Sequence, residues 1–329
     1  MAVCAELGRT RRGGLALENK SAGTGGRAAL DPFNIVVFDD LCSAMAISAD
    51  SSPLVSVVMP AHNAERYLCE ALDSVLVQTY ARLEIIVVDD GSSDSTWQIL
   101  ERYAAADPRV RPFSNEVNRG IVASRNRAFA EASAEARYFA VLDSDDVCMP
   151  DRIAQQVEFL ENHPGHALVG GNTLIIDESS AVIGERRYPS ADADLRRVIT
   201  RYNPIAQPTV MIRKAALEEV GVYDERFPRC QDYDLWLRMC ARYSIANLPE
   251  ITLKYRISST QGKSTHLKAS LRYTIQIQRR WLFRSDFFRP FNVCYWVAEH
   301  ALLLLPEAFT LALFKWMTYR SSKPSASGS

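Results

Sequence analysis

Short apolar runs alternate with amphipathic segments over the first half of the chain. Runs rich in Val, Ile and Leu, bounded by Pro, Gly or Asp, predict buried strands at residues 53–60, 83–88, 110–113 and 138–142. Apolar residues at helical spacing predict helices at residues 65–78 and 96–106, one opening at 118–128, and one reaching Asn162 from Pro150. This alternation predicts an α/β fold with a mostly parallel, doubly wound sheet.

The pattern changes after His163. Two apolar runs, residues 167–177 and 181–187, predict a hairpin, and residues 208–213 predict a further short strand. The segment 214–220 is predicted to be a helix that Gly221 closes, and a second helix is predicted to run through Asp232 to Cys240.

Three carboxylates, Asp143, Asp145 and Asp146, follow directly after the predicted strand at 138–142. In an open α/β sheet, ligands collect beyond the carboxyl ends of the strands. Carboxylates this close repel one another, and a divalent cation would make the arrangement favourable. The alternative is a solvated loop that caps the helix starting near Pro150.

Two further acidic positions have both a functional and a structural interpretation. Asp90 opens a Gly- and Ser-rich junction between strand and helix, which is typical of nucleotide binding but also of a simple helix N-cap. Asp232 lies at a helix start, where an N-cap is again the alternative. Asp234 can pair with Arg238 one helical turn later, and this structural role accounts for it. No GxGxxG sequence follows the first strand, which disfavours an NAD-binding domain.

The C-terminal part is cationic and then aromatic. Residues 254–289 contain nine Lys or Arg and one acid, Asp286. Residues 291–316 are rich in Trp, Phe and Leu, but charged residues and Pro306 interrupt them well before the roughly 18 to 20 residues that a bilayer requires. Two amphipathic helices are predicted, which either cover the α/β domain or lie at a membrane interface with the cationic stretch facing anionic lipid.

Composition narrows the class of protein. The net charge of −1, without a basic helix, argues against nucleic acid as a partner. The seven cysteines are scattered and form no metal-binding spacing, so we expect a reducing compartment, the cytoplasm. The cationic and aromatic C-terminal part extends this expectation to peripheral attachment at the inner face of the cell membrane. Residues 1–52 are interpreted as a disordered leader, or as sequence upstream of a true start near Met45, and residues 321–329 as an unfolded tail.

Five motifs in order resemble those of family 2 glycosyltransferases with the GT-A fold. They are Val58-Met-Pro-Ala-His-Asn63, Val87-Val-Asp-Asp-Gly-Ser-Ser-Asp-Ser-Thr96, Asn118-Arg-Gly-Ile-Val-Ala-Ser-Arg-Asn126, Leu142-Asp-Ser-Asp-Asp146 with Met149-Pro-Asp-Arg152, and Gln231-Asp-Tyr-Asp-Leu-Trp-Leu-Arg238. The resemblance covers roughly residues 53 to 258. It implies a GT-A domain over residues 53–260, followed by a helical region at 261–320.

The resemblance also implies a set of site residues. The nucleotide-sugar site would comprise Pro60, Ala61, Asn63, Asp90, Gly120, Arg125, Asp143 and Asp145. Mg²⁺ or Mn²⁺ would be held by Asp145 and Asp146. Family members often carry Arg-x-His after the last strand; Arg256-Ile-Ser258 lacks that His, and His266 is a candidate substitute ligand.

The implied reaction is metal-dependent transfer of a sugar, with inversion, from a nucleotide-diphosphate donor to an acceptor hydroxyl. Asp232 would be the catalytic base, placed across the sugar from the cation. A UDP-sugar donor and a glycan or lipid-linked acceptor are expected, in cell-surface polysaccharide or glycolipid synthesis. One alternative is a non-catalytic relative that binds nucleotide sugars as a sensor or scaffold. Another, a nucleotidyltransferase, normally needs a Gly-rich basic loop after the first strand, which Pro60-Ala-His-Asn63 lacks.

Overall fold

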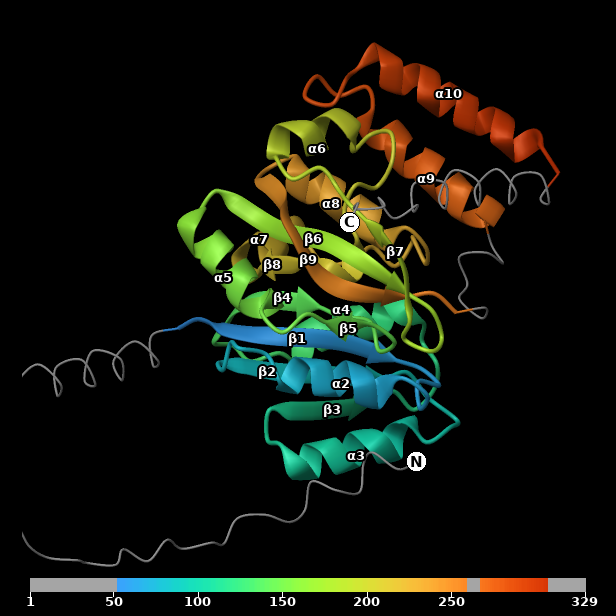
Figure 1. Cartoon of the computed structure of the whole chain (residues 1–329). Helices are drawn as coiled ribbons and strands as arrows, with labels where there is room; N and C mark the ends of the chain where they lie inside the picture. The colour runs from blue at the N-terminus through green and yellow to red at the C-terminus, as the bar shows by residue number, and fades with distance from the viewer. Residues whose placement is uncertain (1–51, 259–266, 307–329) are drawn as a thin grey trace, which may run out of the picture. The chain divides into compact units, whose positions relative to one another are not determined.

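The N-terminal half of the described chain forms four parallel strands with helices between them. The computed structural model describes residues 52–258 and 267–306 (Figure 1). The strands are β1 (Leu54–Ala61), β2 (Leu83–Asp89), β3 (Val110–Ser114) and β4 (Ala136–Val141), in the order β3-β2-β1-β4. The connecting helices are α2 (Leu68–Leu76), α3 (Thr96–Ala106) and α4 (Ile121–Glu131). All of these elements confirm the predicted ones, with ends shifted by up to three residues.

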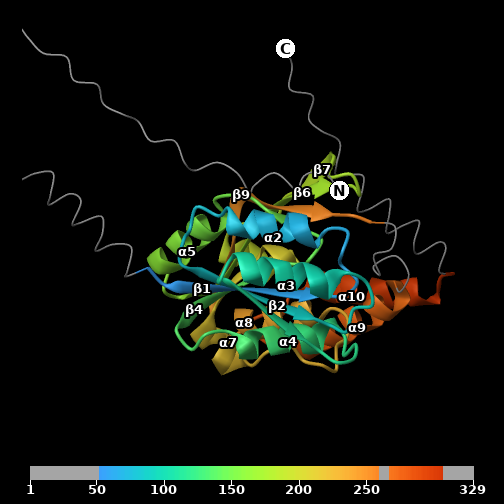
Figure 2. The same ribbon diagram turned by 90° about the horizontal axis from the view of Figure 1, so that it is seen from below.

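The sheet separates two apolar cores, because successive side chains of a strand point to opposite faces. On β1, Val55, Val57 and Met59 pack in one cluster with α2, whereas Val58 packs in the other with α4. Figure 2 shows α2 and α5 (Arg152–Asn162) on one side of the strands, and α4, α7 (Lys214–Val220) and α8 (Gln231–Cys240) on the other. Both faces are therefore covered, as the continuous apolar runs of the strands require.

The sheet continues beyond β4 with mixed strand directions. Its remaining strands are β5 (Val147–Cys148), β6 (His166–Ile176), β7 (Val182–Arg186), β8 (Met211–Arg213) and β9 (Ser244–Arg256). The order runs β4-β8-β6-β9-β5, with β8 antiparallel to both neighbours and β9 parallel to β6. The predicted hairpin is confirmed as β6 and β7. Over the described residues the strands form a nine-stranded α/β sheet with helices on both faces, parallel from β3 to β4 and mixed beyond, and this confirms the predicted fold class.

Local predictions after residue 163 are partly confirmed. Gly221 ends α7 with a φ of 83°, as predicted for a glycine after a helix. The strand predicted at 208–213 is wrong in its first half, because Gln207–Thr209 form a 3₁₀ turn, η1. Pro208, which has no N–H to donate to a sheet, lies in that turn. Helix α6 (Asp192–Val198) was not predicted, and Leu195 is its one buried residue.

Two C-terminal helices lie on the α8 side of the molecule (Figure 1). Helix α9 (Leu267–Trp281) packs on α8 and buries Ile275 and Ile277. Helix α10 (Pro290–Leu304) packs on α9. Within the described ranges, no helix combines the length and apolar character needed to cross a bilayer.

Candidate active site

The carboxyl ends of β1, β2 and β4 meet at one edge of the sheet and bring the first site residues together. Pro60 and Ala61 end β1, and the Ala61 carbonyl accepts a 2.8 Å hydrogen bond from the Asp90 N–H. Asn63 follows with a φ of 49°, a conformation that Asn tolerates better than most residues. Its side-chain oxygen accepts a 2.9 Å bond from the Ser93 N–H. The loops after β1 and β2 are thus fastened to each other.

The Asp90 carboxylate holds a third loop in place. It is 3% exposed and accepts bonds from the Arg119 N–H (2.8 Å), the Gly120 N–H (2.9 Å) and the Asn115 side chain (2.7 Å). Burial alone would raise the pKa of Asp90, but these hydrogen bonds outweigh it and lower the pKa below its usual range. Asp90 is therefore ionised at neutral pH and anchors residues 118–120. It is not an N-cap of α3, because that helix begins at Thr96 and Ser95 occupies the N-cap position.

Two glycines make this junction possible. Gly91 has a φ of 66°, and a Cβ built on it would lie 2.7 Å from the Asn118 backbone nitrogen. Only glycine permits that approach between the two loops. Gly120 has a φ of 89° and lies at the N-terminus of α4, where a Cβ would meet nothing within 4 Å. Gly120 therefore borders open space, at a helix end whose dipole favours anions.

Arg125 on α4 is a buried cation at this edge. It is 1% exposed and forms an ion pair with Asp143, which follows β4. Burial alone would lower the pKa of Arg125, but the Asp143 charge outweighs it and keeps the pKa raised. Tyr223 and Asp232 also interact electrostatically with Arg125. Burial raises the pKa of Tyr223 to about 12, so its hydroxyl stays protonated at neutral pH.

Asp232 lies near this cluster although it is 89 positions from Asp143 in the sequence. It is half-buried in the first turn of α8, where its Oδ2 accepts a 2.8 Å bond from the Asn203 side chain. The N-cap alternative is wrong, because α8 begins at Gln231 after Cys230, whose φ is 58°. Asp234, by contrast, forms the predicted pair with Arg238, with 2.8 Å between Oδ2 and Nε.

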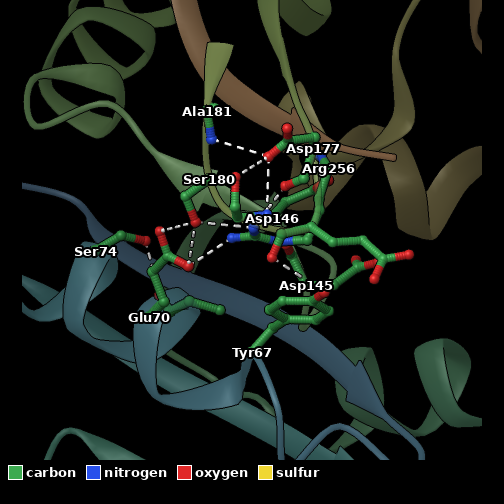
Figure 3. A network of polar contacts seen from close by, with 12 residues as sticks. Tyr67, Glu70, Ser74, Asp145, Asp146, Asp177, Ser180, Ala181 and Arg256 are labelled. Atoms are coloured by element: carbon green, nitrogen blue, oxygen red, sulfur yellow. Dashed lines mark hydrogen bonds and ion pairs between the residues drawn. The ribbon is translucent and has the colours of Figure 1, made fainter. Parts of the chain in front are cut away.

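The acidic turn after Asp143 is fixed by Arg256, a residue to which sequence reasoning gave no role (Figure 3). Arg256 is fully buried at the end of β9. Its backbone N–H donates to Asp146 Oδ1 (2.8 Å), and its Nε donates to the Asp145 carbonyl (2.8 Å).

The rest of the guanidinium joins two other elements to the turn. It bonds to Glu70 on α2 (2.5 Å), to Ser180 Oγ (2.9 Å) and to the Asp177 carbonyl (3.1 Å). It also lies 4.2 Å from the centre of the Tyr67 ring. One buried cation therefore ties the acidic turn to α2 and to the β6–β7 hairpin.

The carboxylates in this turn differ in their availability to a cation. Asp146 is 1% exposed and one of its oxygens is engaged by Arg256, whereas Asp145 is partly exposed. Among residues 52–258 and 267–306, no cluster of three acidic, His or Cys side chains could hold a metal by itself; His266 lies outside these ranges. The donor set fits a hard cation that takes one or two protein carboxylates and completes its shell with phosphate and water oxygens.

Comparison with known proteins gives the family. The model for Glycosyl transferase family 2 matches residues 56–221. EpsE of Bacillus subtilis, named as a glycosyltransferase, is 35% identical over 65% of this chain and 77% of its own length. WfgD of Escherichia coli, named a UDP-Glc:α-D-GlcNAc-diphosphoundecaprenol β-1,3-glucosyltransferase, is 29% identical over 76% of this chain and 93% of its own.

A solved structure shows the same fold. It is the mannosyltransferase PcManGT from Pyrobaculum calidifontis, in complex with GDP-Man and Mn²⁺. PcManGT is 18% identical to this chain and superposes with a TM-score of 0.56 over 88% of this chain and 83% of its own. The predicted resemblance is confirmed by the family match and by this shared fold. The chain belongs to glycosyltransferase family 2 and is a glycosyltransferase with a GT-A fold.

Proposed function

We propose that this glycosyltransferase moves a sugar from a UDP-sugar to an acceptor hydroxyl, with Asp232 as the catalytic base. The observation that carries the proposal is the position of Arg125. This one buried guanidinium is paired with Asp143, which begins the acidic turn, and also interacts with Asp232. The interaction of one guanidinium with carboxylates from two distant parts of the chain supports a single site with two opposed sides, as this reaction requires.

Asp232 has the surroundings expected of a base. It is half-buried, and the 2.8 Å bond from Asn203 fixes the direction of its carboxylate. In the proposed reaction it accepts the proton of the acceptor hydroxyl as that oxygen attacks the anomeric carbon. A single base facing the attacking oxygen, with the diphosphate leaving on the other side, gives direct displacement and inversion at that carbon.

The departing diphosphate gains negative charge, and we assign its stabilisation to the acidic turn. Asp145, with Asp146 behind it, would hold Mg²⁺ or Mn²⁺, which supplies Lewis-acid neutralisation of that charge when bound. Arg125 contributes a fixed positive charge that needs no reorganisation during the reaction. Arg256 keeps Asp145 and Asp146 in position through its two 2.8 Å bonds to the turn.

The donor pocket is assigned to the loops after β1 and β2. Pro60, Ala61 and Asn63 would border the base and ribose, and Asp90 would act at the base edge, besides anchoring residues 118–120. The open space beside Gly120, at the N-terminus of α4, supports assigning the diphosphate to this position. The name of WfgD contains UDP-Glc and diphosphoundecaprenol, which supports UDP as the nucleotide and a lipid-linked glycan as the acceptor for this chain as well.

A donor panel tests the proposal. The full chain is incubated with UDP- and GDP-sugars, Mn²⁺ and candidate acceptors, and released nucleoside diphosphate is measured. Release that depends on the acceptor supports transfer. Tight binding without release would favour a sensor or scaffold. In a parallel incubation with UTP and sugar phosphates, release of pyrophosphate would favour a nucleotidyltransferase.

Chelation tests the cation separately. EDTA is expected to weaken UDP binding, because the diphosphate would otherwise share a cation with Asp145. Asp145→Asn should weaken binding in the presence of Mn²⁺ and remove most of the effect of EDTA. UDP affinity that is the same with Mn²⁺ and with EDTA would reject the acidic turn as a cation site.

A further inference from the structure

Helix α10 presents an apolar stripe to its surroundings. The stripe consists of exposed side chains that recur at three- and four-residue spacing: Phe291, Cys294, Val297, Ala298, Ala301 and Leu304. Three of them are 58% to 87% exposed, namely Val297, Phe291 and Leu304. Such spacing normally buries a helix face in a core, and a contiguous apolar surface marks a contact site. We call this set the outer stripe.

The loop that leads into α10 extends this surface. Phe283 is 59% exposed and Phe288 is 44% exposed, although neighbouring Phe287 is fully buried. Arg284 and Arg289 lie beside these rings in the sequence and are exposed as well. Exposed aromatic rings interspersed with arginines are typical of segments at a lipid interface, where the rings enter the headgroup region and the cations meet phosphate.

A cavity of about 280 Å³ lies between α9 and α10, on the flank of the outer stripe. From α9 it is lined by Arg272, Ile275, Gln276 and Arg279, and from α10 by Trp296, His300 and Leu303. The two arginines are exposed and seven positions apart, so they lie on one face of α9. The lining contains no carboxylate. Glu299, the acidic residue of α10, interacts instead with Gln278 and Tyr233.

From these observations we propose that α9 and α10 dock on an anionic lipid surface. The outer stripe enters the boundary between headgroups and acyl chains, and the exposed Arg272 and Arg279 at the edge of the cavity contact lipid phosphate. The charge supports lipid over a second copy of the chain. The outer stripe carries no acidic side chain that could pair with Arg272 and Arg279 of a second copy, whereas an anionic surface neutralises them.

Hydrogen bonds connect the docking surface to the proposed active site. Asn292 on α10 donates to the Arg197 carbonyl (3.1 Å) and to Thr200 Oγ1 (2.8 Å). Gln278 on α9 donates to the Arg201 carbonyl (3.1 Å). This same connection, residues 197–203, ends in the Asn203 that holds Asp232. Docking would therefore fix the orientation of the acceptor side of the site towards the lipid surface.

Vesicle co-sedimentation of the full chain tests the proposal. Membrane docking is separate from the transfer reaction and uses none of the residues assigned to the active site. The probes are vesicles of phosphatidylcholine alone and vesicles with added phosphatidylglycerol. We expect binding to the anionic vesicles only. The double variants Val297→Asp/Leu304→Asp and Arg272→Glu/Arg279→Glu should each bind them about tenfold more weakly or worse.

Matched controls on the far side of the molecule keep the result specific. Val77→Asp changes a valine that is 66% exposed, and Arg102→Glu changes an exposed arginine of α3. Both should bind as the unsubstituted chain does. Circular dichroism and transfer to a water-soluble acceptor, unchanged in all variants, would show that the catalytic domain is folded.

Several outcomes would overturn the proposal. Equal binding to neutral and anionic vesicles, or undiminished binding by both double variants, would remove the role of the stripe and the cavity. A dimer that Val297→Asp/Leu304→Asp converts to a monomer, without vesicle binding, would assign the stripe to self-association. The vesicle test does not depend on the proposed transfer reaction. Asp232→Asn, which should lose transfer, should still bind vesicles as the unsubstituted chain does.

Discussion

Replacing Arg256 by methionine should destabilise the protein and loosen its acidic turn. Methionine keeps much of the buried stem and removes the guanidinium, which bonds to the Asp145 and Asp177 carbonyls and to Glu70. Breaking a buried ion pair typically costs about 3 to 5 kcal/mol. The Glu70 side chain is 42% exposed and can be rehydrated, so we expect the lower end of this range, about 3 kcal/mol.

The measurement is the free energy of unfolding from urea denaturation, read beside UDP affinity with Mn²⁺. A domain with a typical stability of about 5 to 15 kcal/mol remains folded after this loss. UDP affinity should fall as well, because the turn loses the bond from Arg256 Nε to the Asp145 carbonyl, although the backbone N–H of residue 256 can still bond to Asp146. The stability and UDP affinity of Arg256→Lys should lie between those of the unsubstituted chain and Arg256→Met, because lysine retains the charge but not the planar guanidinium.

Arg66→Met is a matched control for this prediction. Arg66 is 61% exposed, forms an ion pair with Glu178 of the same hairpin, and lies 4.8 Å from the same Tyr67 ring. An exposed pair of this kind contributes about 0 to 1 kcal/mol. If Arg256→Met cost no more than Arg66→Met, or left UDP affinity unchanged, the interpretation of Arg256 as the residue that fixes the acidic turn would be refuted.

Three further predictions follow from single contacts. Asn203→Ala should lower kcat roughly tenfold with little change in the KM for donor, because it removes one hydrogen bond that orients Asp232; a rise in KM alone would contradict this role. Burial raises the pKa of Glu299 to about 7, so the folded state should lose stability as the pH rises from about 4.5 to 7. Glu299→Gln should therefore be more stable than the unsubstituted chain by about 1 to 2 kcal/mol at pH 8 but not at pH 4, as measured by urea denaturation. Gly91→Ala should lower the free energy of unfolding by about 2 kcal/mol or more, because Gly91 has a φ of 66° and lies against the backbone of Asn118. Gly165→Ala, where a Cβ would meet open space, should lower it by less than about 1 kcal/mol.

Local pattern predicted the βα units correctly, because their signals lie within a few residues. The apolar run at Leu83–Asp89 and the helix at Thr96–Ala106 need no distant contact to be recognised. The mixed half of the sheet could not be predicted, since the pairing of β8 with β4 and β6 joins residues far apart in sequence. Helix α6 was missed because one buried residue, Leu195, gives no periodicity.

The site was predictable in its residue types and less so in its contacts. Asp232 and Asp143 were expected at one site, and both interact with Arg125 in the structure. Sequence gave no sign that Asp90 would bond to backbone 30 residues away, or that Arg256 would reach Glu70 across 186 positions. A lone Arg at a strand end carries no local signal of burial. The five motifs made the family predictable, and only the fold made these contacts visible.

The most direct test of the account is the rate of sugar transfer by Asp232→Asn, measured together with its affinity for UDP. Glu225→Gln, which removes an exposed carboxylate from the segment before α8, is the control. The account predicts a fall of about 10²- to 10⁴-fold in transfer with unchanged UDP affinity, because the base acts on the acceptor and not on the nucleotide. Transfer by Asp232→Asn at the rate of the Glu225→Gln control would contradict it.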